Sequence, residues 1–352
     1  MQRILIMKKI HLLCNAHLDP IWLWAKNEGI AEAISTFRVA ADFCEKYDNF
    51  IFNHNESVLY EWVEENEPEL FKRIQKLVKD GKWHIMGGWY LQPDCTMPSA
   101  EGFLRQIEVG NAYFKEKFGV KPSTAINFDP FGHTRGLVQI LKKTGYHSYL
   151  FMRPHNIVGD DTDFIWKGYD GSEIIGHSMW GGYNCARGEV TQKIDRIVED
   201  AHDGANLMLW GVGNHGGGPT RGDIEYLKAN MEREGFNDLE FSSPDDYFDD
   251  IYNDFLDVPS WKDELQHHAS GCYSATSLVK ALNRRAENSL AAAEKWDTIS
   301  SIVTGSKPST ERFKDAWKKV CFNQFHDILC GCSIMESYED VKESEGYALN
   351  IA

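Results

Sequence analysis

Hydrophobic and polar positions alternate with two different periods along the first two thirds of the chain. Short apolar runs bounded by turn residues predict β-strands, and longer stretches with apolar positions three or four residues apart predict amphipathic helices between them. The predicted strands cover residues 10–14, 50–53, 83–86, 125–128, 148–152, 164–169, 173–177, 207–210 and 239–241.

Turn and capping residues mark where several predicted helices begin and end. Ser99 is an expected N-cap for a helix that runs to residue 118, and Ser243-Pro244 opens another in the preferred order. Gly145 ends the helix of residues 137–143, and Asp170-Gly171 predicts a hairpin between two strands. Two further helices are predicted over residues 30–46 and 68–79.

Repeated β-α units predict an α/β fold. The sheet is expected to be mostly parallel, either open or closed into a seven-stranded β/α barrel-like domain. In such folds ligands gather at the carboxyl ends of the strands. Side chains that directly follow a predicted strand are therefore the first candidates for a functional site.

The pattern changes near residue 276, where long helical periodicity replaces the β-α units. Residues 276–299 and 311–329 predict two helices separated by the polar linker GSKPST. We therefore expect an α/β domain over residues 1–261 and a small helical bundle domain over residues 262–352. His326 falls near the C-terminal end of the second predicted helix, which would place a site containing it between the domains.

Composition limits the classes of partner that the chain is expected to bind. With a net charge of -16, the chain of 352 residues is not expected to bind nucleic acid or an anionic membrane, and a neutral substrate suits it. The aromatic content of 12%, including 11 Trp, fits either sugar stacking or an aromatic core. The apolar runs at the N-terminus are too short for a signal peptide or a membrane span, and they predict a first strand. Eight irregularly spaced cysteines suggest reduced thiols in the cytoplasm.

Three widely separated segments carry the candidate chemistry. His17 and Asp19 lie in NAHLDPIW, Asp129 in INFDPFGH and His326 in NQFHDILCG. Two imidazoles and two carboxylates form a suitable ligand set for a Zn²⁺-like ion. Taken singly, each segment has a plainer explanation: a surface loop, a helix cap and a core histidine.

Together, these segments resemble the metal and nucleophile motifs of the α-mannosidases of glycoside hydrolase family 38. Two longer stretches, GGWYLQPDCTMPSAEGFLRQ and ALNRRAENSLAAAE, are also similar to that family. The resemblance covers essentially the whole chain. It implies a hydrolase that removes terminal α-linked mannose from an oligosaccharide or simpler mannoside, and it leaves a homo-oligomer open.

The resemblance also implies roles for individual residues. His17, Asp19, Asp129 and His326 would bind one Zn²⁺ per chain, with another divalent ion as the alternative. Asp129 would also attack the anomeric carbon in a retaining mechanism with a covalent intermediate. Substrate contacts are expected from the side chains of Trp22, Phe131, Arg153 and Asp327.

The chain departs from the family pattern at the general acid/base. Relatives carry an aspartate in the glycine-rich segment, where this chain has Gly213-Asn214-His215-Gly216. His215 is the candidate acid/base because its unperturbed pKa lies near neutrality, and Asp223 is a second option. The same segment matches the pattern G-x-G-x-x-G. No helix is expected to begin directly after it, which disfavours a dinucleotide-binding site.

Two other functions compete with the mannosidase. A metal-dependent sugar deacetylase on a similar barrel could use the same ligand types. Family members usually continue into β-sandwich domains, so this chain is also expected to be the N-terminal part of a larger enzyme. On that view it could be a metal-binding fragment with little or no turnover.

Overall fold

The computed structural model describes residues 8–155, 157–158, 162–179, 181–231, 238–254 and 258–352. Strands and helices alternate through the first 261 residues, and helices follow. The strands are β1 (Lys8–Cys14), β2 (Phe52–His54), β3 (Trp83–Ile85), β4 (Thr124–Asn127), β5 (Ser148–Phe151), β6 (Asp163–Lys167), β7 (Glu173–Ser178), β8 (Gly204–Trp210), β9 (Asp238–Phe241) and β10 (Ser260–Trp261). The α-helices are α1 (Lys26–Lys46), α2 (Ser57–Asn66), α3 (Pro68–Lys79), α4 (Ala100–Phe118), α5 (Gly136–Thr144), α6 (Val190–Asp200), α7 (Arg221–Met231), α8 (Pro244–Asp254), α9 (Ser277–Thr304), α10 (Thr310–Asn323), α11 (His326–Cys330) and α12 (Met335–Ile351).

The predicted, mostly parallel sheet is confirmed, and its strands are divided between two five-stranded sheets. In one sheet the order is β3-β2-β1-β8, with β9 also pairing with β1, and in the other it is β10-β6-β7-β5-β4. Every pairing between described strands is parallel except the β6–β7 hairpin. A hydrogen bond of 3.0 Å from Gly87 N to Thr124 O joins the end of β3 to β4 and brings the two sheets side by side.

Strand β1 is buried on both faces. Ile10, Leu12 and Cys14 belong to one hydrophobic cluster, and Leu13 between them belongs to another. Successive side chains of a strand point to opposite faces, so this central strand has apolar cover on both sides. The loop that follows β1 therefore starts from a rigid position in the middle of the domain.

Several local predictions are confirmed at the level of single residues. The Ser99 side chain accepts a hydrogen bond of 3.1 Å from Gly102 N at the start of α4. Gly145 has a left-handed conformation with φ of 101° at the end of α5. The hairpin at Asp170-Gly171 pairs β6 with β7 in antiparallel register.

Two kinds of difference separate the prediction from the structure. Helices α2, α6, α7 and α12 were not predicted. Six of the first seven residues of α2 are buried, so its apolar positions show no clear helical period. The single helix predicted over residues 311–329 is wrong, because α10 ends at Asn323 and His326 begins a separate short helix.

The break between α10 and α11 is caused by pairing with the α/β domain. Phe325 adopts φ of -48° and ψ of 138°, outside the helical region, and forms a β-bridge with Pro93. Asp94 N also donates a hydrogen bond of 2.9 Å to Gln324 O. These contacts stop α10 and direct the next residue, His326, toward the sheet.

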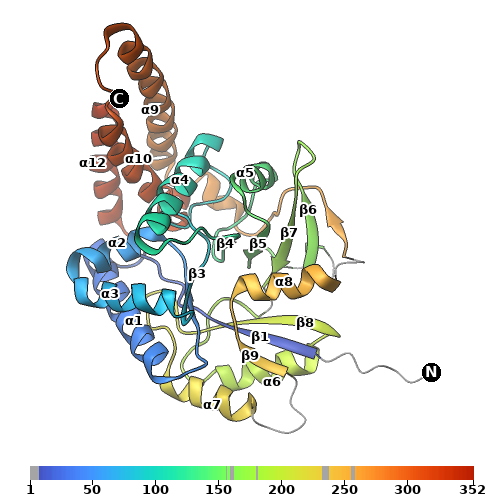
Figure 1. Ribbon diagram of the computed structural model, residues 1–352. Coiled ribbons are helices and arrows are strands. Elements are labelled where there is room, and N and C mark those ends of the chain that lie inside the picture. The colour runs from blue at the N-terminus through green and yellow to red at the C-terminus, as the bar shows by residue number, and fades with distance from the viewer. Residues whose placement is uncertain (1–7, 156, 159–161, 180, 232–237, 255–257) are drawn as a thin grey trace.

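Figure 1 shows α9, α10 and α12 standing together at one end of the molecule, away from the N-terminal strand. Helices α4 and α10 are in contact, so the bundle packs on the α/β domain. Within the described part of the chain, no helix is both long and apolar enough to cross a lipid bilayer.

Candidate metal centre

His17 and Asp19 are held by a short extended pairing beyond the end of β1. Asn214 N donates to His17 O at 2.7 Å, and Asp19 N donates to Asn214 O at 2.8 Å. Because the paired segment is extended, the side chains of residues 17 and 19 point to the same side. Their functional atoms are close together, with His17 Nε2 lying 2.8 Å from Asp19 Oδ1.

Glycines after β8 make this close pairing possible. A Cβ atom at Gly211, whose φ is +125°, would lie 1.9 Å from Asn15 O, and one at Gly213 would lie 2.7 Å from His17 O. The glycine-rich segment therefore lets one backbone approach another. Helix α7 begins at Arg221, after these glycines, in agreement with the sequence argument against a dinucleotide site.

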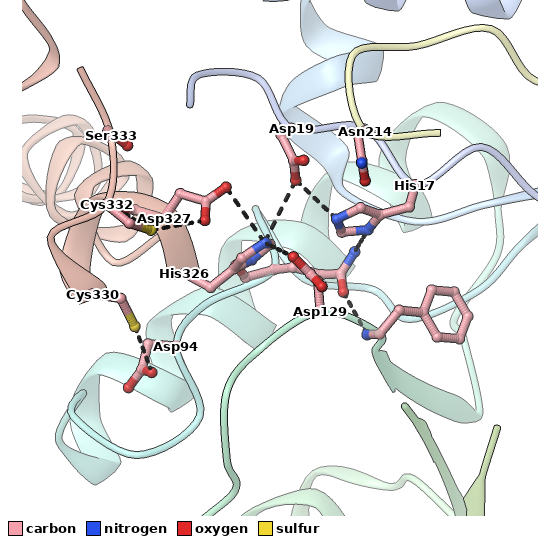
Figure 2. A network of polar contacts seen from close by, with 12 residues as sticks. His17, Asp19, Asp94, Asp129, Asn214, His326, Asp327, Cys330, Cys332 and Ser333 are labelled. Atoms are coloured by element: carbon pink, nitrogen blue, oxygen red, sulfur yellow. Dashed lines mark hydrogen bonds and ion pairs between the residues drawn. The ribbon is translucent and has the colours of Figure 1, made fainter. Parts of the chain in front are cut away.

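Asp129 and His326 complete a cluster of four buried side chains (Figure 2). Asp129 follows β4 and His326 begins α11. His326 Nε2 lies 3.5 Å from both Asp19 Oδ1 and Asp129 Oδ2. The structure thus brings together the four predicted metal ligands from three distant segments.

The pKa values of the side chains in the cluster depend strongly on one another. Burial disfavours a charge on His17, but the adjacent Asp19 carboxylate raises the pKa of the imidazole above its usual value. Burial likewise favours the neutral form of Asp19, yet His17 and His326 hold its pKa well below the usual range. For Asp327, burial is the larger effect and raises its pKa to about 7. A divalent cation would replace the protons that now balance these charges.

The donor atoms fit a metal ion. Among the described residues, His17 Nε2, Asp19 Oδ1, Asp129 Oδ1 and His326 Nε2 are buried and lack a hydrogen bond of good geometry. Ligand atoms of His17, Asp129 and His326 lie within 4.8 Å of one another, as do those of Asp19, His326 and Asp327. Two nitrogen and two oxygen donors suit a tetrahedral Zn²⁺-like ion, and the second grouping makes Asp327 a further candidate ligand.

Three of the four predicted substrate residues lie beside the cluster. Arg153 Nη2 forms an ion pair of 2.7 Å with Asp129 Oδ1, and its guanidinium lies 5.5 Å from the Phe131 ring centroid. The Phe131 and His326 ring centroids are 6.4 Å apart. Asp327 Oδ2 is 3.9 Å from His326 Nε2, and its Oδ1 accepts a hydrogen bond from the Cys332 thiol.

Trp22 is the fourth of these residues, and it is half-buried. Its ring packs edge-on against Trp24 at 5.7 Å, and its carbonyl accepts a hydrogen bond from Ile334 N after α11. Trp22 lies in the segment that carries Asp19, and its carbonyl joins that segment to the one that carries Asp327.

The two acid/base candidates have partners other than Asp129. His215 Nε2 lies 2.6 Å from Glu28 Oε1, and its ring packs edge-on against Trp24. Asp223 accepts a hydrogen bond from the Thr220 hydroxyl at the start of α7, as a capping residue does. No contact within the described residues joins either side chain to Asp129.

Sequence reasoning missed two residues of the site. The Tyr183 hydroxyl donates to Asn214 Oδ1 at 2.5 Å, and its ring centroid lies 4.5 Å from that of His17. Gln92 contacts both histidines. Gln92 lies in the loop after the strand predicted over residues 83–86, so its position was a usable signal. Tyr183 carries no such signal.

Two family models match the chain. Residues 7–264 match the glycosyl hydrolases family 38 N-terminal domain, and residues 267–349 match the alpha mannosidase middle domain. Alpha-mannosidase G of Dictyostelium discoideum is 29% identical over 93% of the chain, and alpha-mannosidase 2C1 of Homo sapiens is 28% identical over 97%. The chain spans about a third of each relative, 31% and 34% respectively.

A solved structure supports the fold independently. The crystal structure of an alpha-mannosidase from Enterococcus faecalis V583 superposes with a TM-score of 0.86 at 22% identity. The superposition covers 98% of this chain and 41% of that one. At this identity the likeness concerns the fold.

Proposed function

The chain belongs to glycoside hydrolase family 38, and from this premise we propose that the whole protein is a metal-dependent retaining α-mannosidase. Its substrates would be oligosaccharides or simpler mannosides with a terminal α-linked mannose. The observation that carries the proposal is the convergence of the buried side chains of His17, Asp19, Asp129 and His326, whose potential ligand atoms lie close together.

In this proposal, His17, Asp19, Asp129 and His326 hold one Zn²⁺. When bound, the ion would supply Lewis-acid polarisation of the mannose 2- and 3-hydroxyls and favour the ring distortion that precedes bond cleavage. The protein contributes ligand atoms on rigid segments. His17, Asp19 and Asp129 lie beyond the ends of buried strands, and His326 begins a helix whose residues are buried.

Asp129 is the proposed nucleophile. One carboxylate oxygen attacks the anomeric carbon as the glycosidic bond breaks, and water then hydrolyses the resulting mannosyl ester with net retention. The 2.7 Å ion pair with Arg153 orients the carboxylate for attack. Phe131 and Trp22 would pack against the sugar, and Asp327 would accept hydrogen bonds from its hydroxyls.

His215 remains our proposed general acid and base. Glu28 at 2.6 Å is suited to orient its imidazole, as a carboxylate commonly does for a catalytic histidine. For proton transfer to the leaving group, the imidazole would have to turn from Glu28 toward the sugar. A cytoplasmic location and a homo-oligomeric state also stay predictions.

An activated 2-deoxy-2-fluoro or 5-fluoro α-mannosyl donor tests the function. Fluorine slows both steps, whereas a good leaving group restores only the first, so the mannosyl-enzyme should accumulate. Peptide mapping should locate the sugar on Asp129. Asp129→Asn should abolish labelling and turnover, while Asp223→Asn, which alters a buried capping carboxylate, should leave labelling in place.

Both this chain and a longer version of the protein belong in the experiment. Labelling of a different carboxylate would show that Asp129 is not the nucleophile, and an inverted product would reject the retaining mechanism. If the longer version turns over an aryl α-mannoside and this chain does not, the chain is a metal-binding fragment of the enzyme. Hydrolysis of N-acetylated sugars without mannosidase activity would favour the deacetylase alternative.

A further inference from the structure

Gln92 is a fully buried residue between β3 and α4 that contacts all three segments of the metal centre. Its side-chain Oε1 accepts a hydrogen bond of 2.8 Å from Phe128 N, and its carbonyl oxygen lies 3.2 Å from His326 Nδ1. Its Nε2 lies 3.3 Å from His17 Nδ1 and donates to Glu56 Oε1. Gln92 itself belongs to none of these three segments.

The contact with Phe128 fixes the backbone that carries Asp129. Strand β4 ends at Asn127, so the amide of Phe128 lies one residue before the proposed nucleophile and beyond the regular ladder of the sheet. A buried amide needs a partner, and the Gln92 side chain provides it. The position of the Asp129 carboxylate therefore depends on an amide group from another loop.

The contact with His326 orients its imidazole. Because a carbonyl oxygen can only accept, Nδ1 donates its proton to the Gln92 carbonyl, and Nε2 faces the other proposed ligands. The Gln92 side chain also limits rotation of His17, since it packs at the Nδ1 edge while Nε2 faces Asp19.

The loop around Gln92 has its own anchors, so its backbone does not depend on the Gln92 side chain. Gln106 Oε1 accepts a hydrogen bond of 3.1 Å from Leu91 N, and Gln106 Nε2 donates to Cys321 O at 2.7 Å. Asp94 N is bonded to Gln324 O. Asn206 also carries a buried side-chain amide, but it bonds to His202 and Gly204 and to none of the proposed metal ligands, which makes it a matched control.

We propose that Gln92 is a positioning residue of the metal centre, and that its side-chain amide, held by Glu56, aligns Asp129 for the ion while its carbonyl orients His326. The inference rests on the proposed function for the identity of the ion. It assigns Gln92 no contact with substrate. Its effect is on metal affinity and on the geometry of the bound ion.

The test compares metal affinity among variants by chelator competition with Zn²⁺, with the d–d spectrum of bound Co²⁺ as a second readout. Gln92→Leu should lower Zn²⁺ affinity about 10- to 100-fold, the usual effect of removing a group that orients ligands. Asn206→Leu should lower thermal stability but keep the affinity. The exchanged pair Gln92→Glu with Glu56→Gln restores an acceptor for Phe128 and a donor–acceptor pair at position 56, so it should recover most of the affinity.

Each outcome decides the inference. It is overturned if Gln92→Leu binds Zn²⁺ like the wild type, if Asn206→Leu loses as much affinity, or if the exchanged pair gives no recovery. Because the readout is metal affinity, a wild-type protein that binds Zn²⁺ but cleaves no mannoside would reject the proposed function and leave the Gln92 comparison valid. A wild-type protein that binds no divalent ion would overturn both.

Discussion

At the scale of single residues, the metal centre concentrates charge where water is excluded. Each of His17, Asp19, Asp129 and His326 is at most 7% exposed. Buried charges are costly unless they are paired or coordinate a metal. Without an ion, the pairing of imidazoles with carboxylates offsets part of this cost, and with an ion the same atoms become ligands. The cluster therefore lowers the stability of the fold locally and provides a binding site for an ion.

The role of His215 can be tested through the leaving group. If it is the general acid, His215→Gln should lower kcat/KM for an alkyl α-mannoside by about 10²- to 10⁴-fold. The loss should be much smaller for a 2,4-dinitrophenyl mannoside, whose leaving group needs no proton. Glu28→Gln should show the same pattern more weakly. Equal and small losses on both substrates would move the role to another residue.

Glu345 in α12 should make stability depend on pH. Burial raises its pKa to about 7, and its Oε2 has no hydrogen-bond partner among the described residues. Because the folded-state pKa is above the unfolded one, the folded protein binds the proton more tightly. Stability is therefore lost as pH rises from about 4.5 to about 7.

Glu345→Gln removes this ionisation. We expect the variant to be more stable than the wild type at pH 8, on the order of 1–3 kcal/mol, and similar at pH 4. Thermal unfolding at both pH values measures the difference. Glu339→Gln changes an exposed residue of the same helix and should show no such dependence. A Glu345→Gln variant with the same advantage at both pH values would contradict the explanation.

At the scale of elements, the site is built from loops that directly follow strands. Asp129 follows β4, Arg153 follows β5, Asn214 follows β8, and Gln92 lies in the loop after β3. Parallel strands direct these loops to the same edge of a sheet, which is why residues distant in sequence meet there. Glycines allow the loops after β1 and β8 to touch.

Gly211→Ala should strongly destabilise the α/β domain. The added methyl would lie 1.9 Å from Asn15 O at a φ of +125°, so both the backbone and its neighbour must shift. A loss of about 3 kcal/mol or more is expected, with weakened metal binding because residues 15 and 17 move together. Gly346→Ala lies in the exposed interior of α12 with nothing within 4 Å and should stabilise by about 0.5–1 kcal/mol. Comparable melting temperatures for the two variants would rule out this account.

At the scale of the whole molecule, the metal centre lies where the helical part of the chain meets the α/β domain. Three of the proposed ligands come from the α/β domain and His326 from α11. The interface is reinforced by the Pro93–Phe325 bridge and by Arg105, which pairs with Glu294 at 2.5 Å. An ion bound there would connect the two parts of the chain.

His326→Ala should abolish stoichiometric Zn²⁺ binding and leave the α/β domain folded. The variant removes one of four ligands, and the α/β domain keeps its own hydrophobic clusters. Metal analysis and circular dichroism should be measured together. Zn²⁺ should raise the melting temperature of the wild type but not of the variant. His202→Ala, an exposed histidine, is the control, and full Zn²⁺ occupancy in His326→Ala would identify His326 as a core histidine.

The α/β class, most of the strands and the caps of α4 and α5 could be predicted from the sequence. These features depend on local periodicity and on the backbone preferences of single residues. The sequence also singled out His17, Asp19, Asp129 and His326 as chemically suited to one ion. Their convergence, the break before His326 and the orientation of His215 toward Glu28 were decided by tertiary structure. Each depends on contacts between segments far apart in the chain, such as Pro93 with Phe325, and such contacts leave no periodic pattern in either segment. Gln92 shows the same limit most clearly, since its four partners lie 36 to 234 residues away and its role follows from hydrogen bonds formed only after folding.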